Sequence, residues 1–350
     1  MPNNNNSERI TILRPLLILL IVTTHVQGNL YRIDLQDVPL QFDNFIHALL
    51  SGAVASSALP LLSIIAGYLA GHTFTRKPYG SSILTKVDRI LMPMLAWNFL
   101  AAVYVLWEQG KGLPSRQDIP LLSGGMEIWF YALTGFLRVP ANPPLYFLRE
   151  LFICFLFAPL FLQLVRSRLL FAAFFLFVAV CAVKNINFGF FQRIDIYGFF
   201  VLGLFLYRQQ GTFENTTLLQ RKWFQLGWLL LFMVLACALT VYGFQDRPEH
   251  FLQLRKGLTL VGPLAFWIVS GYVGGWFKQL LLWLSPASFM VFLGHSAFLA
   301  LYWQAWILLF KSSPLTRYYG AYWVSAVLLS MLSMFVLRWL WVGYLHRATK

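Results

Sequence analysis

Long apolar runs separated by short polar segments alternate along the whole chain. Ten of these runs approach or reach the roughly 20 residues that an α-helix needs to cross a membrane. They lie at about 10–28, 46–72, 87–107, 145–165, 169–184, 194–207, 223–243, 257–275, 286–310 and 319–345. The pattern predicts an all-α fold, a polytopic membrane bundle of about ten transmembrane helices.

Composition points to the same class of protein. Of the 350 residues, 59% are hydrophobic and 11% are charged, whereas a soluble domain has about 25% charged residues. The formal net charge of +14 comes from short basic groups between apolar runs rather than from a dense basic arm. We therefore expect membrane lipids and a polyanionic substrate as partners, and no nucleic acid. One membrane-embedded domain, 1–350 with a short polar tail at 1–9, is sufficient for the chain.

Basic residues set the predicted orientation. An even number of spans leaves both ends on one side, and the basic residues of that side are packed into short loops. Positive charge in short loops marks the cytoplasmic face, so both termini are expected in the cytoplasm. The apolar run after the polar start is too long for a signal peptide and is expected to remain as the first helix.

Two polar residues interrupt the first apolar run. Arg14 and His25 are eleven positions apart, which returns to within about 20° of the same helix face and separates them by about 16 Å along the axis. A charged side chain near the middle of a membrane helix costs about 2.5–3.5 kcal/mol. We therefore expect both side chains to face the protein interior or a hydrated space rather than lipid.

Three local features qualify the helix pattern. The second span has a stripe of small residues that lets a neighbouring backbone approach closely, namely Ser63, Ala66, Gly67, Ala70 and Gly71. Pro93 is expected to kink the start of the third span. The apolar segment GMEIWFYALTGFL is only about thirteen residues long, which predicts a re-entrant or interfacial helix.

Four stretches of the chain carry polar residues in a characteristic order. They are R-x10-H at Arg14 and His25, KVDRILMP with Lys86 and Arg89, PLYFLRELFICFLFAPL with Arg149 and Glu150, and LSPASFMVFLGHSAFL with His295. This ordered set resembles the acyltransferase 3 family, membrane enzymes that acylate sugars and other acceptors. The chain departs from the family pattern at Ala66, Lys86, Tyr146 and Glu150. Lys86 stands where the family has an arginine, and lysine offers a point charge where arginine offers a bidentate fork.

The resemblance implies an O-acyltransferase that moves an acyl group, most simply acetyl, from cytoplasmic acyl-CoA to a sugar hydroxyl of a surface or periplasmic glycan. Acyl-CoA, in the simplest case acetyl-CoA, is then the donor substrate, and no cofactor stays bound. His25 is the expected general base, and Arg14 the expected catalytic or acyl-CoA-binding cation. Lys86 and Arg89 are expected to hold the phosphates of the carrier at the cytoplasmic side. The expected location is the bacterial inner membrane.

These four side chains also have structural interpretations. His25 could simply form a hydrogen bond near a helix end, and Arg14 could pair with a buried acid such as Glu150. Lys86 and Arg89 occupy positions where membrane topology alone places basic residues. The sequence by itself leaves both interpretations open.

Further candidates lie in the central and last spans. Arg149 and Glu150 are neighbours that point in different directions on a helix, which argues against their pairing and favours one or both facing a central cavity. His295 could shape the acceptor site or only form a hydrogen bond with a neighbouring helix. His47 and His72 lie at predicted helix ends, where a place at the membrane interface is sufficient.

The remaining patterns narrow the function. No group of histidines, cysteines or acids has metal-ligand spacing, so no metal is expected, and Cys154, Cys181 and Cys237 are interpreted as core residues. A transporter or flippase of a lipid-linked sugar stays the alternative function, because it would also need buried charges. The oligomeric state is not predicted.

Overall fold

The structure of the chain is a computed structural model that describes residues 4–26, 41–112, 119–184, 186, 188–209, 217–245, 251–311 and 319–348. Helices form most of these residues, and no strand occurs in these ranges. The predicted all-α fold is therefore confirmed.

Helix occurs at all ten predicted spans, but several of these helices are short or charged. Within the described residues, five helical segments are long and apolar enough to cross a membrane, or six if two helices bent by 64° form one span. They are Phe42–Arg76, Tyr79–Gly110, Lys222–Phe244, Gly275–Phe310 and Tyr319–Leu340, with the bent pair Pro143–Leu156 and Ala158–Leu164. The chain is thus a multi-pass membrane protein, and the number of ten spans stays a prediction.

Contacts divide the chain into two compact units. Unit 1 comprises Met1–Leu62 and Thr216–Lys350, and unit 2 comprises Ser63–Asn215. The boundary falls inside α3 (Ala58–Arg76), a helix whose first residues belong to unit 1 and whose remainder belongs to unit 2. The prediction of one membrane-embedded domain remains a prediction.

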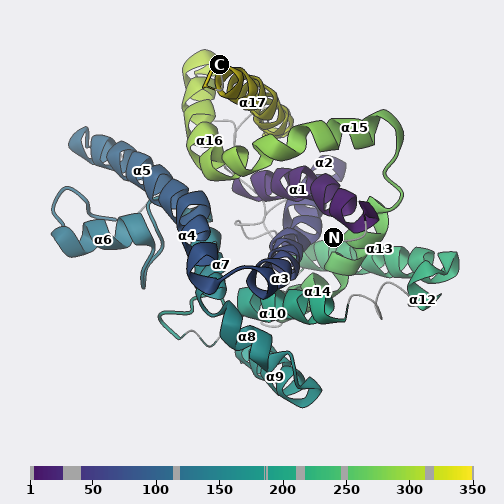
Figure 1. Ribbon diagram of the computed structural model, residues 1–350. Coiled ribbons are helices and arrows are strands. Elements are labelled where there is room, and N and C mark those ends of the chain that lie inside the picture. The colour runs from purple at the N-terminus through teal and green to yellow at the C-terminus, as the bar shows by residue number, and fades with distance from the viewer. Residues whose placement is uncertain are drawn as a thin grey trace. The chain divides into compact units, whose positions relative to one another are not determined.

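Unit 1 is built around the first helix, α1 (Asn4–His25), which carries Glu8, Arg9 and Arg14 among its 22 residues. The other helices of the unit are α2 (Phe42–Ala48), η3 (Leu49–Val54), η4 (Ala55–Ser57), α12 (Thr217–Gln220), α13 (Lys222–Gln245), α14 (Phe251–Ser270), α15 (Gly275–Leu284), η7 (Ser285–Ala287), α16 (Ser288–Phe310) and α17 (Tyr319–Ala348). α1 contacts α14, α15, α16 and α17 as well as η3, η4 and η7 (Figure 1). The first helix is therefore enclosed largely by the last helices of the chain.

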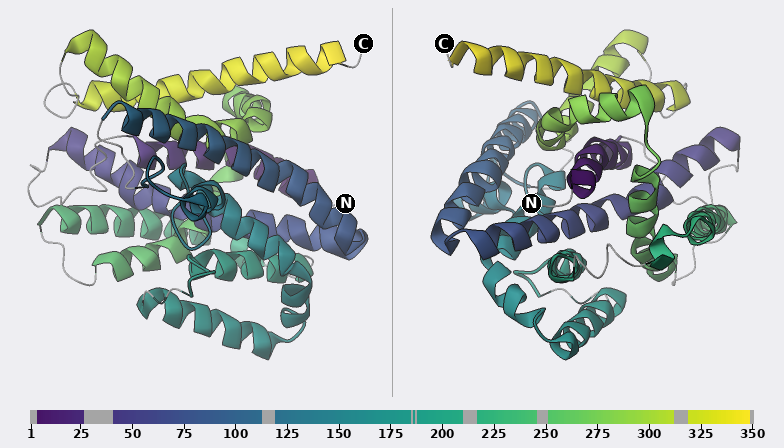
Figure 2. Two further views of the ribbon diagram at one scale, coloured as in Figure 1. Left: turned by 90° about the vertical axis from the view of Figure 1, so that its left-hand side faces the viewer. Right: turned by 45° about the vertical axis from the view of Figure 1, so that its right-hand side comes forward.

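Two pairs of antiparallel neighbours complete unit 1. α13 packs against α14, and α16 packs against α17 (Figure 2). α16 follows directly from η7, whose Pro286 stands in the first turn, where its missing N–H removes no helical hydrogen bond. Pro263 lies inside α14.

Unit 2 contains, after α3, the helices α4 (Tyr79–Lys86), η5 (Val87–Leu91), α5 (Met92–Gly110), α6 (Met126–Thr134), η6 (Pro143–Leu145), α7 (Tyr146–Leu156), α8 (Ala158–Leu164), α9 (Arg168–Lys184) and α10 (Ile194–Arg208). α3 and α10 approach each other at backbone distance. A Cβ atom on Gly67 would lie 2.0 Å from the Phe200 carbonyl oxygen, and one on Gly203 would lie 2.1 Å from the Ile64 carbonyl oxygen. The predicted close approach at the small-residue stripe is confirmed.

The helix of the third span begins before its predicted start, at Tyr79, and contains the π-helical turn η5 just ahead of Pro93. Proline has no N–H to donate, and an extra residue in the preceding turn relieves the clash of its ring with the chain. Lys86 and Arg89 lie at the start of this turn and within it.

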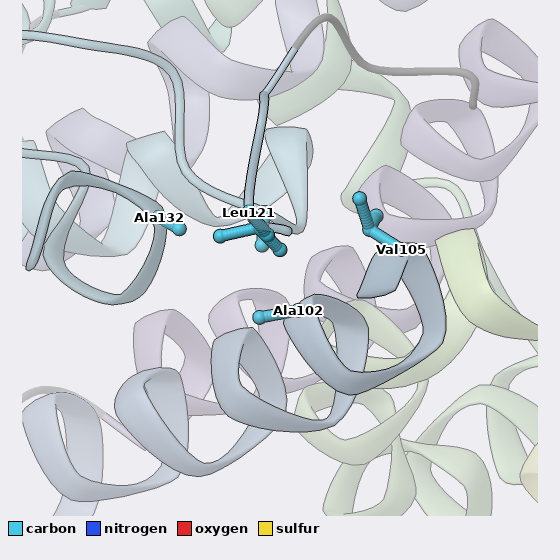
Figure 3. Close-up of a cluster of buried hydrophobic side chains, with 5 residues drawn as sticks. Ala102, Val105, Leu121 and Ala132 are labelled. Atoms are coloured by element: carbon cyan, nitrogen blue, oxygen red, sulfur yellow. The ribbon is translucent and has the colours of Figure 1, made fainter. Parts of the chain in front are cut away.

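The short helix α6 folds back on α5 and has nine residues, in keeping with the prediction of a non-spanning helix. Its contact with α5 is a cluster of small and apolar buried side chains, Ala102, Val105, Leu121, Ala132 and Ala141 (Figure 3). The buried side chain of Asn98 joins the two segments by donating from Nδ2 to the Leu133 carbonyl oxygen at 2.7 Å. Small residues here let the helices approach closely.

Candidate functional site

His25 and His295 meet in unit 1, although they are far apart in the sequence. His25 is the last residue of α1, and His295 lies in α16. Their ring centroids are 5.0 Å apart and their planes are inclined by 71°, so the edge of one imidazole contacts the face of the other. His295 is 3% exposed. The last motif of the sequence thus contacts the first.

Hydrogen bonds orient the imidazole of His25. Its Nδ1 lies 2.8 Å from the Ile21 carbonyl oxygen and 2.9 Å from the hydroxyl of Thr24. A carbonyl oxygen only accepts, so Nδ1 carries the proton of the neutral ring and Nε2 carries the basic lone pair. This tautomer is the one that a general base acting through Nε2 requires.

His295 has the same tautomer for the same reason. Its Nδ1 lies 2.8 Å from the Phe292 carbonyl oxygen. Its Nε2 is buried and has no hydrogen-bond partner in the described part of the chain. The pair therefore places close to His25 a second basic nitrogen that is unoccupied by any described protein group.

Arg14 lies on the buried face of α1. At about 100° per residue, Ile18 and Ile21 flank the direction shared by Arg14 and His25, and both isoleucines are buried. Arg14 forms no hydrogen bond or ion pair with the residues that the structure describes. An interior cation that pairs with none of the described residues can bind an anionic or carbonyl group of a ligand.

Other charges near the start of α1 are held by protein. Glu8 forms an ion pair with Lys278 of α15. The guanidinium of Arg9 lies 5.5 Å from the ring centroid of Trp267 in α14 and packs against Gly271. These contacts attach the first turns of α1 to its neighbours, in contrast to Arg14.

Lys86 and Arg89 lie in unit 2 and differ in their surroundings. The ammonium of Lys86 is 4.4 Å from the ring centroid of Phe155 in α7, a cation–π contact. Arg89 is exposed, in the π-helical turn. Arg89 is therefore accessible to a polyanion, and Lys86 is anchored beside it.

Arg149 and Glu150 form an ion pair, so the prediction that they would not pair is wrong. Arg149 Nη1 lies 2.6 Å from Glu150 Oε1, and the two residues are 5% and 0% exposed. Their Cβ atoms point in different directions, but the long arginine side chain bends back to its neighbour. In a buried setting this removes the cost of two separate unpaired charges.

Three further contacts complete this network. Glu150 Oε2 accepts a hydrogen bond from the Tyr197 hydroxyl at 2.5 Å, and Oε1 accepts one from the Gln192 backbone N–H at 3.3 Å. Arg149 also donates to the Phe190 carbonyl oxygen. Both oxygens of Glu150 thus accept hydrogen bonds within unit 2. The place of Arg149 and Glu150 at an acceptor site stays a prediction.

Sequence reasoning missed the residues that hold these groups. Thr24 contacts His25 Nδ1, and Tyr197 contacts Glu150. Thr24 directly precedes the histidine in the sequence, and that adjacency is a usable signal. Tyr197 gives no such signal, because its contact depends on the packing of α10 against α7.

Comparison with known proteins identifies the family of the chain. The family model described as an acyltransferase domain matches residues 7–340. The chain is 28% identical over 324 residues to the succinoglycan biosynthesis protein ExoH of Rhizobium meliloti strain 1021. The matched region covers 86% of this chain and 81% of that protein. No solved structure matches. The expected family is confirmed: the chain belongs to the acyltransferase 3 family and is a multi-pass membrane acyltransferase.

Proposed function

We propose that this protein transfers an acyl group, most simply acetyl, from acyl-CoA to a sugar hydroxyl of a surface or periplasmic glycan. The observation that carries the proposal is the contact of His25 with His295, in which both rings have their basic nitrogen at Nε2. The name of the similar Rhizobium meliloti protein concerns succinoglycan biosynthesis, which favours a glycan as the acceptor.

In the proposed reaction His25 acts as the general base. Nε2 takes the proton of the acceptor hydroxyl while its oxygen bonds to the thioester carbon. The carbon–sulfur bond then breaks, and the leaving thiolate takes the proton back from the imidazolium. Such a base typically contributes 10²- to 10⁴-fold to the rate. His295 supports the edge of His25 and keeps the ring aimed at the hydroxyl.

Arg14 and the basic residues of unit 2 would act on the carrier. Arg14 is about 16 Å from His25 along α1, too far for both to touch one carbonyl, so it would bind a more distant polar or anionic group of acyl-CoA. Arg89, which is exposed, and Lys86, which is half-buried beside it, would bind phosphates. The proposed setting is the bacterial inner membrane, with both termini and the donor in the cytoplasm.

The test replaces His25 by alanine in the native strain and measures acylation of the glycan by mass spectrometry. We expect acylation to fall by about 10²- to 10⁴-fold. His72→Ala is the matched control, since His72 lies in unit 2 near Tyr207 and takes no part in the proposed reaction. If the His25→Ala protein is made and inserted at normal levels and acylation persists, the proposed mechanism is wrong.

A further inference from the structure

A second polar cluster lies in unit 1 and is not used by the proposed acyl transfer. The imidazole of His47 in α2 lies 5.2 Å from the ring of Tyr319 and 5.0 Å from the ring of Trp323, both in α17. The ring of Tyr322, also in α17, links Trp306 to this group: its centroid lies 6.2 Å from that of Tyr319 and 5.4 Å from that of Trp306 in α16. We call His47, Tyr319, Trp323 and Trp306 the polar aromatic cluster.

The cluster holds buried polar atoms that form no hydrogen bond with the described part of the chain. His47 is 5% exposed and Trp306 is 8% exposed. Both ring nitrogens of His47, the hydroxyl of Tyr319 and the indole nitrogens of Trp306 and Trp323 are buried and have no hydrogen-bond partner within the described ranges. A buried polar group left without a partner costs about 1–3 kcal/mol. Five such atoms in one cluster leave hydrogen-bonding capacity for a polar ligand.

An aromatic belt at the membrane surface does not explain the cluster. Belt residues turn their rings outward at the level of the lipid headgroups. Trp339 and Trp276, each 74% exposed, have the exposure that a belt residue needs. His47 and Trp306 are turned inward instead. The cluster therefore resembles the lining of a binding site more closely than a lipid anchor.

The chemistry of the cluster fits a sugar. Two indole N–H groups donate, and the tyrosine hydroxyl and the neutral imidazole each both donate and accept. None of the four side chains is a lysine, an arginine or an acid. Such a set matches the hydroxyl groups of a neutral ligand, while the flat rings pack on its apolar C–H face.

The cluster is also connected to the histidine pair. Trp306 follows His295 by eleven residues on the continuous helix α16. It thus lies within about 20° of the same face and about 16 Å further along the axis. An extended ligand that reaches both would have one end at the reacting histidines and another part at the cluster.

We propose that the polar aromatic cluster binds a sugar unit of the acceptor glycan other than the unit that receives the acyl group. This assignment rests on the proposed acyltransferase function. It makes His47, Tyr319, Trp323 and Trp306 acceptor-binding residues. The acceptor is then an oligosaccharide or polymer, because a single sugar cannot reach both places.

The experiment measures glycoside binding without any acyl donor. The full chain is placed in lipid nanodiscs prepared without glycoside detergents, whose sugar headgroups would compete. The probes are the methyl glycosides of disaccharides of glucose, galactose and mannose, and saturation-transfer NMR detects binding. We expect at least one probe to bind, and Trp323→Phe, Tyr319→Phe and His47→Phe each to weaken that binding at least tenfold. Trp339→Phe, on the exposed face of the same helix, should leave it unchanged.

The outcomes separate this inference from the proposed reaction. His25→Ala should lower acylation by about 10²- to 10⁴-fold and keep glycoside binding. Glycoside binding that is sensitive to Trp323→Phe in a protein without acyltransferase activity would support the cluster and refute the reaction. Wild-type protein that binds none of the probes would overturn the inference. So would binding that all three cluster variants leave intact, and each of these variants keeps an aromatic ring so that folding is preserved.

Discussion

The buried pair of Arg149 and Glu150 gives a quantitative test of whether these residues stabilise unit 2 or act on a substrate. Arg149→Leu leaves the Glu150 carboxylate at 0% exposure without its cation. Removing one partner of a buried ion pair costs about 3–5 kcal/mol. Replacing both residues by leucine removes both charges. The remaining cost is that of the Tyr197 hydroxyl, about 1–3 kcal/mol, and the smaller one of the part-buried Gln192 N–H, whose contact is long at 3.3 Å. The double variant should therefore be more stable than the single one.

The assay is denaturant unfolding of purified protein in one detergent, followed by tryptophan fluorescence, with glycan acylation measured alongside. Arg193→Leu is the matched control, because Arg193 forms an ion pair with Asp195 at 2.7 Å that is about half exposed. Such surface pairs contribute about 0–1 kcal/mol. A double variant as unstable as Arg149→Leu would refute the reasoning. An Arg149→Leu protein of normal stability that lacks acylation would instead place the pair at the substrate.

Three further predictions test other parts of the fold and site. Gly67→Ala should lower the free energy of unfolding by about 1–3 kcal/mol, since its Cβ would meet an α10 carbonyl oxygen. Gly80→Ala is the control, because the space around Gly80 is open, and equal stability of the two variants would contradict the close approach. Arg89→Ala should weaken binding of labelled acyl-CoA about tenfold or more, and a wild-type protein that binds no acyl-CoA would favour the flippase. Thr24→Val removes a hydroxyl beside His25 Nδ1 and should slow acylation up to about tenfold, with glycoside binding unchanged. Acylation at the wild-type rate would exclude an orienting role for this hydroxyl.

The helical segments and the geometry of α1 could be predicted from the sequence because both are local. Apolar runs fix where helices form, and the regular rise of a helix fixes the spacing of Arg14 and His25 whatever surrounds them. The close approach at Gly67 could also be predicted, since only small side chains permit it. The number of membrane crossings could not, because α9 and α10, of 17 and 15 residues, are too short for length alone to decide.

Side-chain partners across the fold could not be predicted. The contact of His25 with His295 depends on α16 packing against α1. The pairing of Arg149 with Glu150 depends on burial, which forces a flexible arginine to turn toward its neighbour. The burial of the His47 side chain against α17 could not be predicted either, because it depends on the packing of α17.

The enclosure of α1 by α14–α17 has a consequence for biogenesis. The ribosome makes α1 first and its covering helices last, so Arg14 leaves the ribosome long before its final surroundings exist. With α1 as the membrane span that the sequence predicts, the nascent chain carries an insertion cost of about 2.5–3.5 kcal/mol during that interval, and we expect the translocon or a chaperone to hold the segment. Chains that stop before α16 lack His295 and expose the polar face of α1. They are expected to be targets for membrane proteases, because the exposed polar face of α1 distinguishes an incomplete unit 1 from a complete one.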